Sequence, residues 1–229
     1  MVRISAGSYD LNKWLYGGYE TDIITTIYGP AGSGKTNFCL LAAVSQAQKG
    51  NKVLFIDTEG GFSVERVKQL AGSDAGEILK HIILLKPTTF AEQKEAFKEL
   101  LKQITKSHFG LIIVDGMTML YRLDFGEARG KSIDELQDVN SELARQMRTL
   151  AEIARKNNLP VIVTNQVYGW NDETRMVAGD ILQYWSKCLI ELTSENGKRT
   201  ANLRKHRSLP EKKLDFQIVH EGIKKRGWL

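Results

Sequence analysis

The residues best suited to chemistry form one string, Gly29-Pro30-Ala31-Gly32-Ser33-Gly34-Lys35-Thr36. This string fills the pattern G-x-x-x-x-G-K-[ST] and stands between a β-branched run at 23–28 and a helical stretch at 36–49. Glycines let such a loop turn tightly enough for backbone N–H groups to face phosphate oxygens, and the helix N-terminus adds its positive dipole end. We therefore expect a phosphate-binding loop in which Lys35 neutralises the β and γ phosphates of a nucleotide and Thr36 binds Mg²⁺.

Two carboxylates could complete this site. Asp115 ends the apolar run 111–114, which is the form of a Walker B strand whose carboxylate holds the water shell of Mg²⁺. Glu59 stands two residues beyond the run that ends at Asp57, so it would lie at the same sheet edge and could orient the attacking water. The alternative for Glu59, an exposed turn carboxylate, stays open on spacing alone.

The elements that must position these residues alternate along the chain. Short apolar runs typical of strands buried on both faces lie at 23–28, 53–57, 82–85, 111–115 and 161–164. Helical stretches lie at 36–49, 90–106 and 132–157. This alternation predicts an α/β fold of the P-loop type, with a mostly parallel central sheet flanked by helices. Runs at 188–192 and 214–219, with a turn at 195–198, predict antiparallel C-terminal strands.

Two stretches, 116–131 and 167–179, lack regular periodicity. Each follows a predicted strand, and ligands of parallel sheets bind at the carboxyl ends of strands. We therefore expect both stretches to be loops that face the site.

The composition limits the class of protein. The chain has 229 residues, of which 42% are hydrophobic and 26% charged, which fits a single globular domain over 1–229 with a full core. Cys39 and Cys188 show no zinc or disulfide spacing, and no apolar run has the length of a signal peptide or a membrane span. A cytoplasmic protein that does not span a membrane is therefore expected.

Positive charge is concentrated near the C-terminus. The formal net charge is +5, but residues 198–226 hold ten basic and three acidic side chains, a local net charge of +7. This distribution fits a polyanionic partner and a solvated strand face about equally well.

Both irregular stretches combine aromatic residues with cations, as proteins that grip single strands do by stacking bases on rings. The residues are Tyr121, Arg122, Phe125, Arg129 and Lys131 in the first stretch and Tyr168, Trp170 and Arg175 in the second. The alternative is that these aromatic rings cover an edge of the core or meet a partner protein.

Several strings together resemble the RecA-like recombinase family, in its archaeal and eukaryotic branch. They are Asp57-Thr58-Glu59-Gly60-Gly61-Phe62, Glu65-Arg66, Val163-Thr164-Asn165-Gln166-Val167 and Leu209-Pro210-Glu211. The resemblance implies that Glu59 is the catalytic glutamate, that Gln166 senses the γ-phosphate, and that Arg66 packs on adenine. It also implies that 116–131 and 167–179 are the DNA loops L1 and L2, which assigns DNA contact to Arg122, Arg129, Trp170 and Arg175.

The string Lys205-His206-Arg207 extends this resemblance. In RecA-like and KaiC-like ATPases, a Lys-x-Arg pair at this place can reach the γ-phosphate of a neighbouring subunit, which implies a trans-acting role for Lys205 and Arg207. A solvated basic strand end is the alternative, and it stays open.

Some parts of the family pattern are missing. Only about twenty residues precede the first long strand, too few for an N-terminal helical domain or a linker with a Phe-x-x-Ala polymerisation motif. The one such string, Phe125-Gly126-Glu127-Ala128, lies in L1. We therefore doubt that the chain forms a recombination filament or performs strand exchange alone.

The resemblance with its missing parts implies an accessory or mediator protein of homologous recombination and DNA repair. Such a protein would bind ATP with Mg²⁺, hydrolyse it weakly, and contact DNA, favouring single strands without sequence preference. Its partners would include a RadA-type recombinase, with homo-oligomers left open. An ATP-hydrolysing recombinase and a KaiC-like signalling ATPase are the alternatives, which DNA-stimulated turnover in a filament and absence of DNA binding would respectively select.

Overall fold

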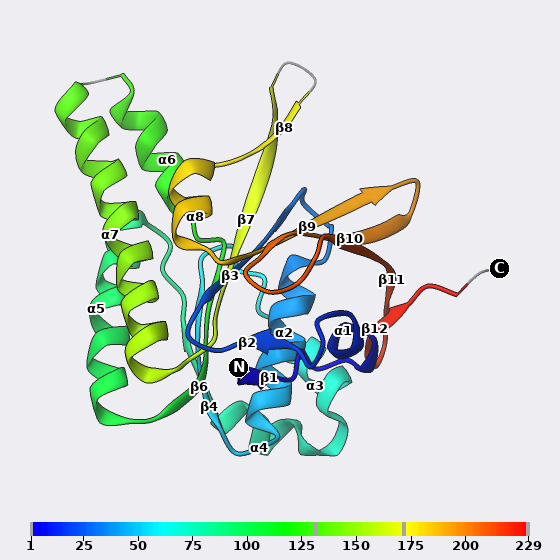
Figure 1. Cartoon of the computed structure of the whole chain (residues 1–229). Helices are drawn as coiled ribbons and strands as arrows, with labels where there is room; N and C mark the ends of the chain where they lie inside the picture. The colour runs from blue at the N-terminus through cyan, green and yellow to red at the C-terminus, as the bar shows by residue number, and fades with distance from the viewer. Residues whose placement is uncertain (1, 131, 171–172, 228–229) are drawn as a thin grey trace.

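One large sheet runs through the protein, shown in Figure 1 as a computed structural model. The structure describes residues 2–130, 132–170 and 173–227, with only the backbone described at 170, 173 and 174. The strands of the large sheet are β3 (Ile24–Gly29), β4 (Lys52–Asp57), β5 (Ile82–Leu85), β6 (Phe109–Asp115), β7 (Val161–Trp170), β8 (Glu173–Met176), β9 (Cys188–Glu195), β10 (Lys198–His206), β11 (Lys212–Val219) and β12 (Gly222–Lys225). A separate antiparallel pair is formed by β1 (Arg3–Ile4) and β2 (Tyr19–Glu20).

The strand order is β12-β11-β10-β9-β3-β7-β6-β4-β5, with β8 paired to β7. Neighbouring strands from β9 to β5 are parallel, while β10, β11 and β12 continue the sheet in antiparallel fashion. The predicted α/β class, with a parallel centre and antiparallel C-terminal strands, is confirmed.

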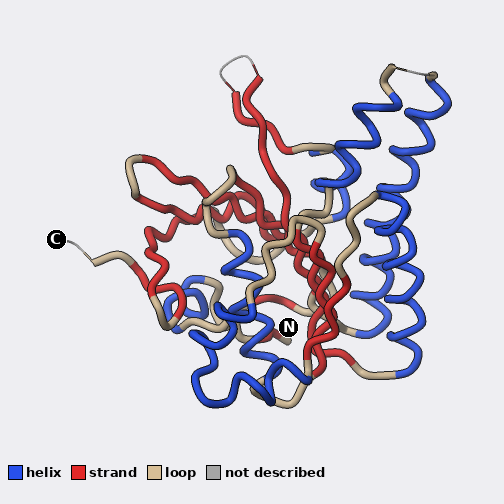
Figure 2. The backbone as a smooth tube through the Cα atoms, turned by 180° about the vertical axis from the view of Figure 1, so that it is seen from behind, coloured by secondary structure: helices blue, strands red, loops and turns tan. Residues whose placement is uncertain are grey.

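Helices cover both faces of the sheet (Figure 2). The first layer contains α1 (Tyr9–Trp14), α2 (Lys35–Ala47), α3 (Val64–Ala71) and α4 (Ala75–Lys80), and the second contains α5 (Phe90–Lys106), α6 (Met119–Ala128), α7 (Ile133–Asn157) and α8 (Gly179–Trp185). The two cores use alternate residues of the same strands: Leu111 and Ile113 of β6 join the first core, and Ile112 and Val114 the second. This alternation explains the continuous apolar runs, because both faces of each central strand are buried. Among the described residues, no helix combines the length and apolar character needed to cross a membrane.

The long helix α7 forms as its sequence predicts. Ser132 is its N-cap, and its hydroxyl accepts a hydrogen bond from the Glu135 amide at 3.2 Å. Leu143, Met147 and Leu150 line its buried face. The helix ends where Asn158 takes a left-handed conformation, with φ of 51°.

The prediction that 116–131 is irregular is wrong for most of the stretch. Residues 119–128 form α6, which packs against α7. Leu120, Tyr121 and Ala128 are buried on one side of α6, and these contacts stabilise a helix whose interior contains Gly126.

The second stretch, 167–179, is likewise not irregular. Strand β7 continues to Trp170 and pairs with β8 as an antiparallel hairpin, in which Val167 faces Met176 and Tyr168 faces Arg175. Cross-strand hydrogen bonds satisfy the backbone here, so this segment needs no apolar periodicity of its own. The intervening Asn171 and Asp172, like Lys131 in the first stretch, lie outside the described residues.

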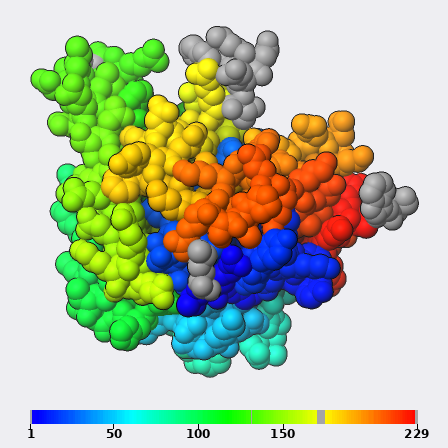
Figure 3. All heavy atoms as spheres, in the orientation of Figure 1, coloured from blue at the N-terminus to red at the C-terminus, as the bar shows by residue number. Residues whose placement is uncertain are grey.

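These two segments stand out as arms. Figures 1 and 3 show the end of the α6–α7 hairpin and the β7–β8 hairpin as two separate projections on the same side of the molecule. We call them the helical arm (residues 119–143 without 131) and the strand arm (residues 167–176 without 171 and 172).

Candidate nucleotide site and its two arms

The sheet register brings the predicted site residues to one edge. Gly29 at the end of β3 is the ladder partner of Gln166 on β7, and Asp57 at the end of β4 is the partner of Asp115 on β6. Because these four strands are parallel, their carboxyl ends lie side by side, at the edge where α/β proteins bind ligands.

The loop 29–36 has the shape of a phosphate cradle. Gly32 and Gly34 have φ of 73° and 108°, which side chains rarely permit, and a Cβ at Gly34 would lie 3.1 Å from the Ile218 side chain. Gly34 is also the N-cap of α2, where no side chain caps the helix and no acidic residue occupies the first turn. The amide groups of this helix end are therefore available to an anion.

The Lys35 side chain lies inside the loop. It is only 5% exposed, and its Nζ donates to the carbonyl oxygens of Gly29 and Pro30, each at 3.0 Å. Burial lowers the pKa of the Lys35 ammonium from its usual value, while the charges of Glu59 and Asp115 oppose this shift. A bound phosphate would compete with the two carbonyls for this ammonium.

Asp115 joins three elements through its two carboxylate oxygens. Thr36 Oγ1 of α2 donates to Oδ2 at 2.7 Å, and Thr164 Oγ1 of β7 donates to Oδ1 at 2.6 Å. Burial raises the pKa of Asp115 to about 6, although both hydrogen bonds act in the opposite direction. A threonine hydroxyl next to a carboxylate fits Mg²⁺, which takes one or two protein oxygens and completes its shell with phosphate oxygens and water.

Glu59 reaches the same place. Its Oε1 is buried without a hydrogen-bond partner among the described residues, and a Cβ on Gly116 would lie 2.6 Å from the Glu59 Cγ. The loop that carries Glu59 is fixed by Asp57, whose carboxylate accepts from the amides of Gly61 at 3.1 Å and Phe62 at 2.9 Å. An acceptor oxygen with no partner beside the phosphate loop suits a group that orients water.

The structure thus brings Lys35, Thr36, Asp115 and Glu59 together. It adds Asp57 and Thr164, which the sequence analysis did not identify as site residues. Asp57 ends β4, and Thr164 ends the apolar run 161–164 within β7, so a polar residue at the end of an apolar run is the signal that could have marked them.

Arg66 lies at the edge of the site in α3. Its guanidinium donates to Asn37 Oδ1 at 2.9 Å, to Gln69 Oε1 at 2.7 Å and to the carbonyl oxygens of the β11–β12 turn. Its N–H edge is therefore occupied within the chain, and the predicted contact with adenine would use the flat face of the guanidinium.

Lys205 and Arg207 do not join the site. Lys205 pairs with Leu189 of β9, which pairs with Thr26 near the start of β3, whereas the phosphate loop follows the end of that strand. Arg207 donates to Glu20 Oε2 at 2.7 Å and to Asp22 Oδ1 at 2.6 Å, and Lys205 Nζ donates to the Gln183 carbonyl at 2.9 Å. Both cations face away from the nucleotide site of their own chain, and their trans-acting role stays a prediction.

The predicted DNA residues divide between surface and core. Arg122 and Arg129 of the helical arm and Arg175 of the strand arm are exposed. Tyr121 is 5% exposed and donates to Asn140 Oδ1 at 2.7 Å, so its ring belongs to the core. The Trp170 side chain lies outside the described residues.

The Rad51 family model matches residues 1–226. The chain belongs to the Rad51 family. Within this family it is 42% identical over 223 residues to a DNA repair and recombination protein RadB of Methanobrevibacter smithii, covering 93% of this chain and 92% of the relative. A RadB of Methanocaldococcus jannaschii is 41% identical, with 93% and 98% covered.

A solved structure supports the same placement. A crystal structure of the RadB recombinase superposes on the chain with a TM-score of 0.81 and 37% identity, covering 98% of this chain and 100% of that one. This similarity covers the central sheet, both helical layers and the antiparallel C-terminal strands, so the Rad51 fold is shown over nearly the whole chain.

Replacing Lys35 with Ala should weaken nucleotide binding. The substitution removes a charged donor from the phosphates, a contact worth about 1.5–3 kcal/mol, or roughly ten- to a hundredfold in affinity. Titration with a fluorescent nucleotide measures the change. The exposed Lys49→Gln is the control, and a thermal melt shows whether loss of the two carbonyl contacts loosens the fold. Unchanged affinity in a folded Lys35→Ala variant would contradict the assignment.

The pKa of Asp115 gives the site a pH dependence. Protons compete with Mg²⁺ for this carboxylate, so the Mg²⁺-dependent part of nucleotide affinity should weaken as the pH falls through about 6. Asp115→Asn should abolish this dependence, which also separates it from titration of the nucleotide itself.

The free energy of unfolding responds to pH in the opposite sense. Because the folded-state pKa of Asp115 is raised, ionised Asp115 reduces stability above pH 6, and protonation relieves that cost. Equal pH profiles of Mg²⁺-dependent nucleotide affinity in the parent and in Asp115→Asn would refute the metal role of Asp115.

Proposed function

We propose that the chain is an accessory or mediator protein of homologous recombination and DNA repair that binds ATP with Mg²⁺, contacts DNA and hydrolyses ATP slowly. Membership of the Rad51 family and the similarity to proteins named DNA repair and recombination protein RadB support the biological setting. The observation that carries the proposal is the hydrogen-bond network that connects the phosphate loop to the roots of both arms.

This hydrogen-bond network begins at Asp115, one of the two residues expected to hold Mg²⁺. Asp115 accepts from Thr164, whose hydroxyl also accepts from the Gly116 amide at 2.7 Å, immediately before the helical arm. The next residue, Asn165, accepts from the Thr118 hydroxyl and donates to the Val177 carbonyl at 2.8 Å, at the end of the strand arm. Ligand at Thr36 and Asp115 would therefore act on groups that hold both arms.

Gln166 provides a second connection. It is the ladder partner of Gly29 at the start of the phosphate loop, and its carbonyl accepts from the Val177 amide at 3.2 Å, which closes the strand arm. This position supports the role expected from the resemblance, in which Gln166 reports the γ-phosphate to the DNA-contacting hairpin.

The slow turnover follows from what the isolated chain can supply. Transferring the γ-phosphate to water is accelerated when a cation stabilises the developing charge. Arg207, expected to act in trans, is held by Glu20 and Asp22, and Lys205 by the Gln183 carbonyl. The contacts of Arg207 with Glu20 and Asp22, and of Lys205 with the Gln183 carbonyl, would have to break when a neighbouring subunit or a RadA-type partner binds. This requirement favours an accessory role over a recombinase that acts alone.

Turnover and DNA binding measured on one preparation separate the alternatives. The accessory function predicts DNA affinity with slow turnover that DNA alone does not raise to recombinase levels. Filament formation with DNA-stimulated turnover would favour a direct recombinase. Absence of DNA affinity at low salt would favour a KaiC-like signalling ATPase.

Glu59→Gln should separate nucleotide binding from hydrolysis. The amide cannot accept a proton from water, so turnover should fall by roughly a hundredfold or more while ATP affinity changes little. Because the parent is expected to be slow, a single-turnover assay with labelled ATP makes the comparison. Glu65→Gln, which changes an exposed carboxylate of α3, is the matched control. Cleavage at the parent rate by Glu59→Gln would remove Glu59 from this role.

Cations of the helical arm should contribute to DNA affinity. Each lysine or arginine that contacts a phosphate releases counterions, so replacing both Arg122 and Arg129 with Gln should lower the salt slope for single-stranded DNA by about 1.4. Binding isotherms on a homopolymer at several salt concentrations provide the slope. Arg148→Gln, on the part of α7 away from the arm, should leave it unchanged. An unaltered slope in the double variant would show that the helical arm does not carry DNA contact.

A further inference from the structure

The excess positive charge of the C-terminal quarter is not spread evenly over it. Arg204 is paired with Glu191 at 2.6 Å, Arg207 with Glu20 and Asp22, and Lys224 with Glu221 at 3.1 Å. Lys212 stacks its ammonium on the Tyr16 ring, 3.9 Å from the centroid. These four cations are therefore engaged in contacts within the protein.

Four of the six remaining cations, Lys198, Lys213, Lys225 and Arg226, line one groove of about 740 Å³, whereas Arg199 and Lys205 are not part of its lining. Its lining includes five cationic residues, Lys13, Lys198, Lys213, Lys225 and Arg226. None of the five has an ion-pair partner within 4.0 Å among the described residues. Figure 1 places the contributing elements, α1, the β9–β10 hairpin, β11 and β12, together on a side of the molecule away from the helical arm.

The carboxylates of the groove are engaged with neutral donors. Asp215 accepts from the Thr200 hydroxyl at 2.8 Å, and Asp10 accepts from the backbone amide of Lys225 at 2.7 Å. The wall also contains Trp14, whose indole nitrogen is buried without a hydrogen-bond partner among the described residues. The described lining therefore has a net charge of +3, and its two carboxylates form no ion pair with its cations among the described residues.

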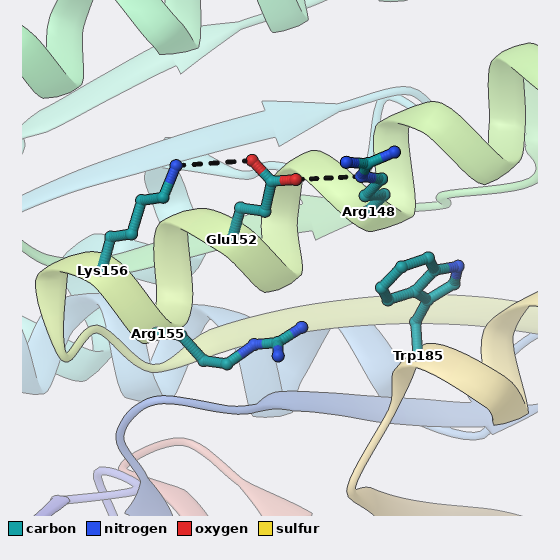
Figure 4. A pocket seen from close by; sticks show the side chains of 5 residues that line it. All are labelled: Arg148, Glu152, Arg155, Lys156 and Trp185. Atoms are coloured by element: carbon teal, nitrogen blue, oxygen red, sulfur yellow. Dashed lines mark hydrogen bonds and ion pairs between the residues drawn. The ribbon is translucent and has the colours of Figure 1, made fainter.

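A second basic pocket shows the contrast (Figure 4). Between α7 and α8, Arg148 and Lys156 lie on either side of Glu152, which pairs with them at 2.9 and 3.6 Å. There Glu152 pairs with two of the three cations, and the lining of three cations and one carboxylate has a net charge of +2. In the groove at α1, by contrast, neither lining carboxylate lies within 4.0 Å of a lysine or arginine nitrogen among the described residues.

The lining also indicates the chemistry of the occupant. Among the described lining residues, Trp14 and Leu214 are each 7% exposed, so these two side chains offer little aromatic face for stacking a base and little apolar surface of the kind that dominates protein interfaces. Ammonium groups on flexible stems are suited to phosphate oxygens and carry no information about base identity.

We propose that this groove binds the phosphodiester backbone of a nucleic acid, as a contact surface separate from the two arms and indifferent to base sequence. The proposal rests on the proposed function for its ligand, and it adds Lys13 of the N-terminal helix to the residues that contact DNA.

The test replaces Lys13, Lys198 and Lys213 with Gln together and measures affinity for homopolymer single strands as a function of salt. Each lost phosphate contact should lower the slope by about 0.7, so the triple variant should lose about 2. Lys49, Lys80 and Lys102 are exposed lysines outside the groove, and their triple Gln variant is the matched control for a loss of three charges. Equal melting temperatures of both variants and the parent ensure that folded proteins are compared.

Four outcomes are distinguishable. A slope reduced only in the groove variant, equally on poly-dT and poly-dA, supports the proposal. A slope that falls equally in both triple variants would show a non-specific charge effect and overturn it. An unchanged groove variant in a protein that binds DNA through Arg122 and Arg129 would overturn the groove and leave the proposed function intact. If the parent binds no DNA but poly-glutamate protects the groove lysines from acetylation, the groove binds acidic peptide, and both the groove proposal and the DNA-binding function fail.

Discussion

The buried carboxylate of Asp115 determines how the site and its surroundings are arranged. It lies among apolar strands and has no cation within ion-pair distance in the described chain, so its charge is stabilised mainly by two threonine hydroxyls from different elements. One hydroxyl belongs to Thr36 in the first turn of α2 and the other to Thr164 within β7. Burying a carboxylate is unfavourable unless its oxygens are hydrogen-bonded, so the positions of α2, β6 and β7 depend on one another. The raised pKa of Asp115 shows that the two hydroxyls compensate burial incompletely, and a divalent cation would complete the compensation.

This dependence extends to the arms because two polar side chains, Thr164 and Asn165, follow one another in the middle of β7. Thr164 faces Asp115, and Asn165 bonds to Thr118 at the root of the helical arm and to the carbonyl of Val177 at the root of the strand arm. Buried polar groups cannot lose a partner cheaply, so a shift of Asp115 toward a metal ion would move hydroxyl and amide groups that hold both roots. The candidate phosphate site and the roots of the two arms are therefore parts of one hydrogen-bonded structure.

What the sequence could predict depended on whether each feature is local. The glycine-rich loop and the N-cap of α7 are defined by residues within a few positions of each other, and the structure has a helix beginning after that loop and Ser132 as the N-cap of α7. Asp57 and Thr164 act through neighbours that only the strand order supplies, so the sequence alone could not identify their roles. Helix α6 was missed because packing against α7, rather than its own apolar pattern, stabilises it. The strand arm was missed because its backbone N–H and C=O groups are paired across the β7–β8 hairpin, which requires no apolar pattern in the sequence.

The net charge of residues 198–226 is another feature whose meaning depends on contacts that only the fold supplies. Counting residues 198–226 gives a local charge of +7, and that number alone fits a solvated strand face as well as a polyanion site. The fold separates these cations into those paired with carboxylates and those without an ion pair among the described residues. Arg204 and Arg207 hold β10 to β9 and to the N-terminal segment, where carboxylates neutralise them. Lys198 and Lys213 keep unneutralised charge and are joined by Lys13 from the other end of the chain. Because α1 packs against β12, the charge of the groove belongs to the folded arrangement of distant segments and not to the basic segment itself. A cation already paired in the fold must lose that partner before it can bind a phosphate, whereas an unpaired one pays no such cost.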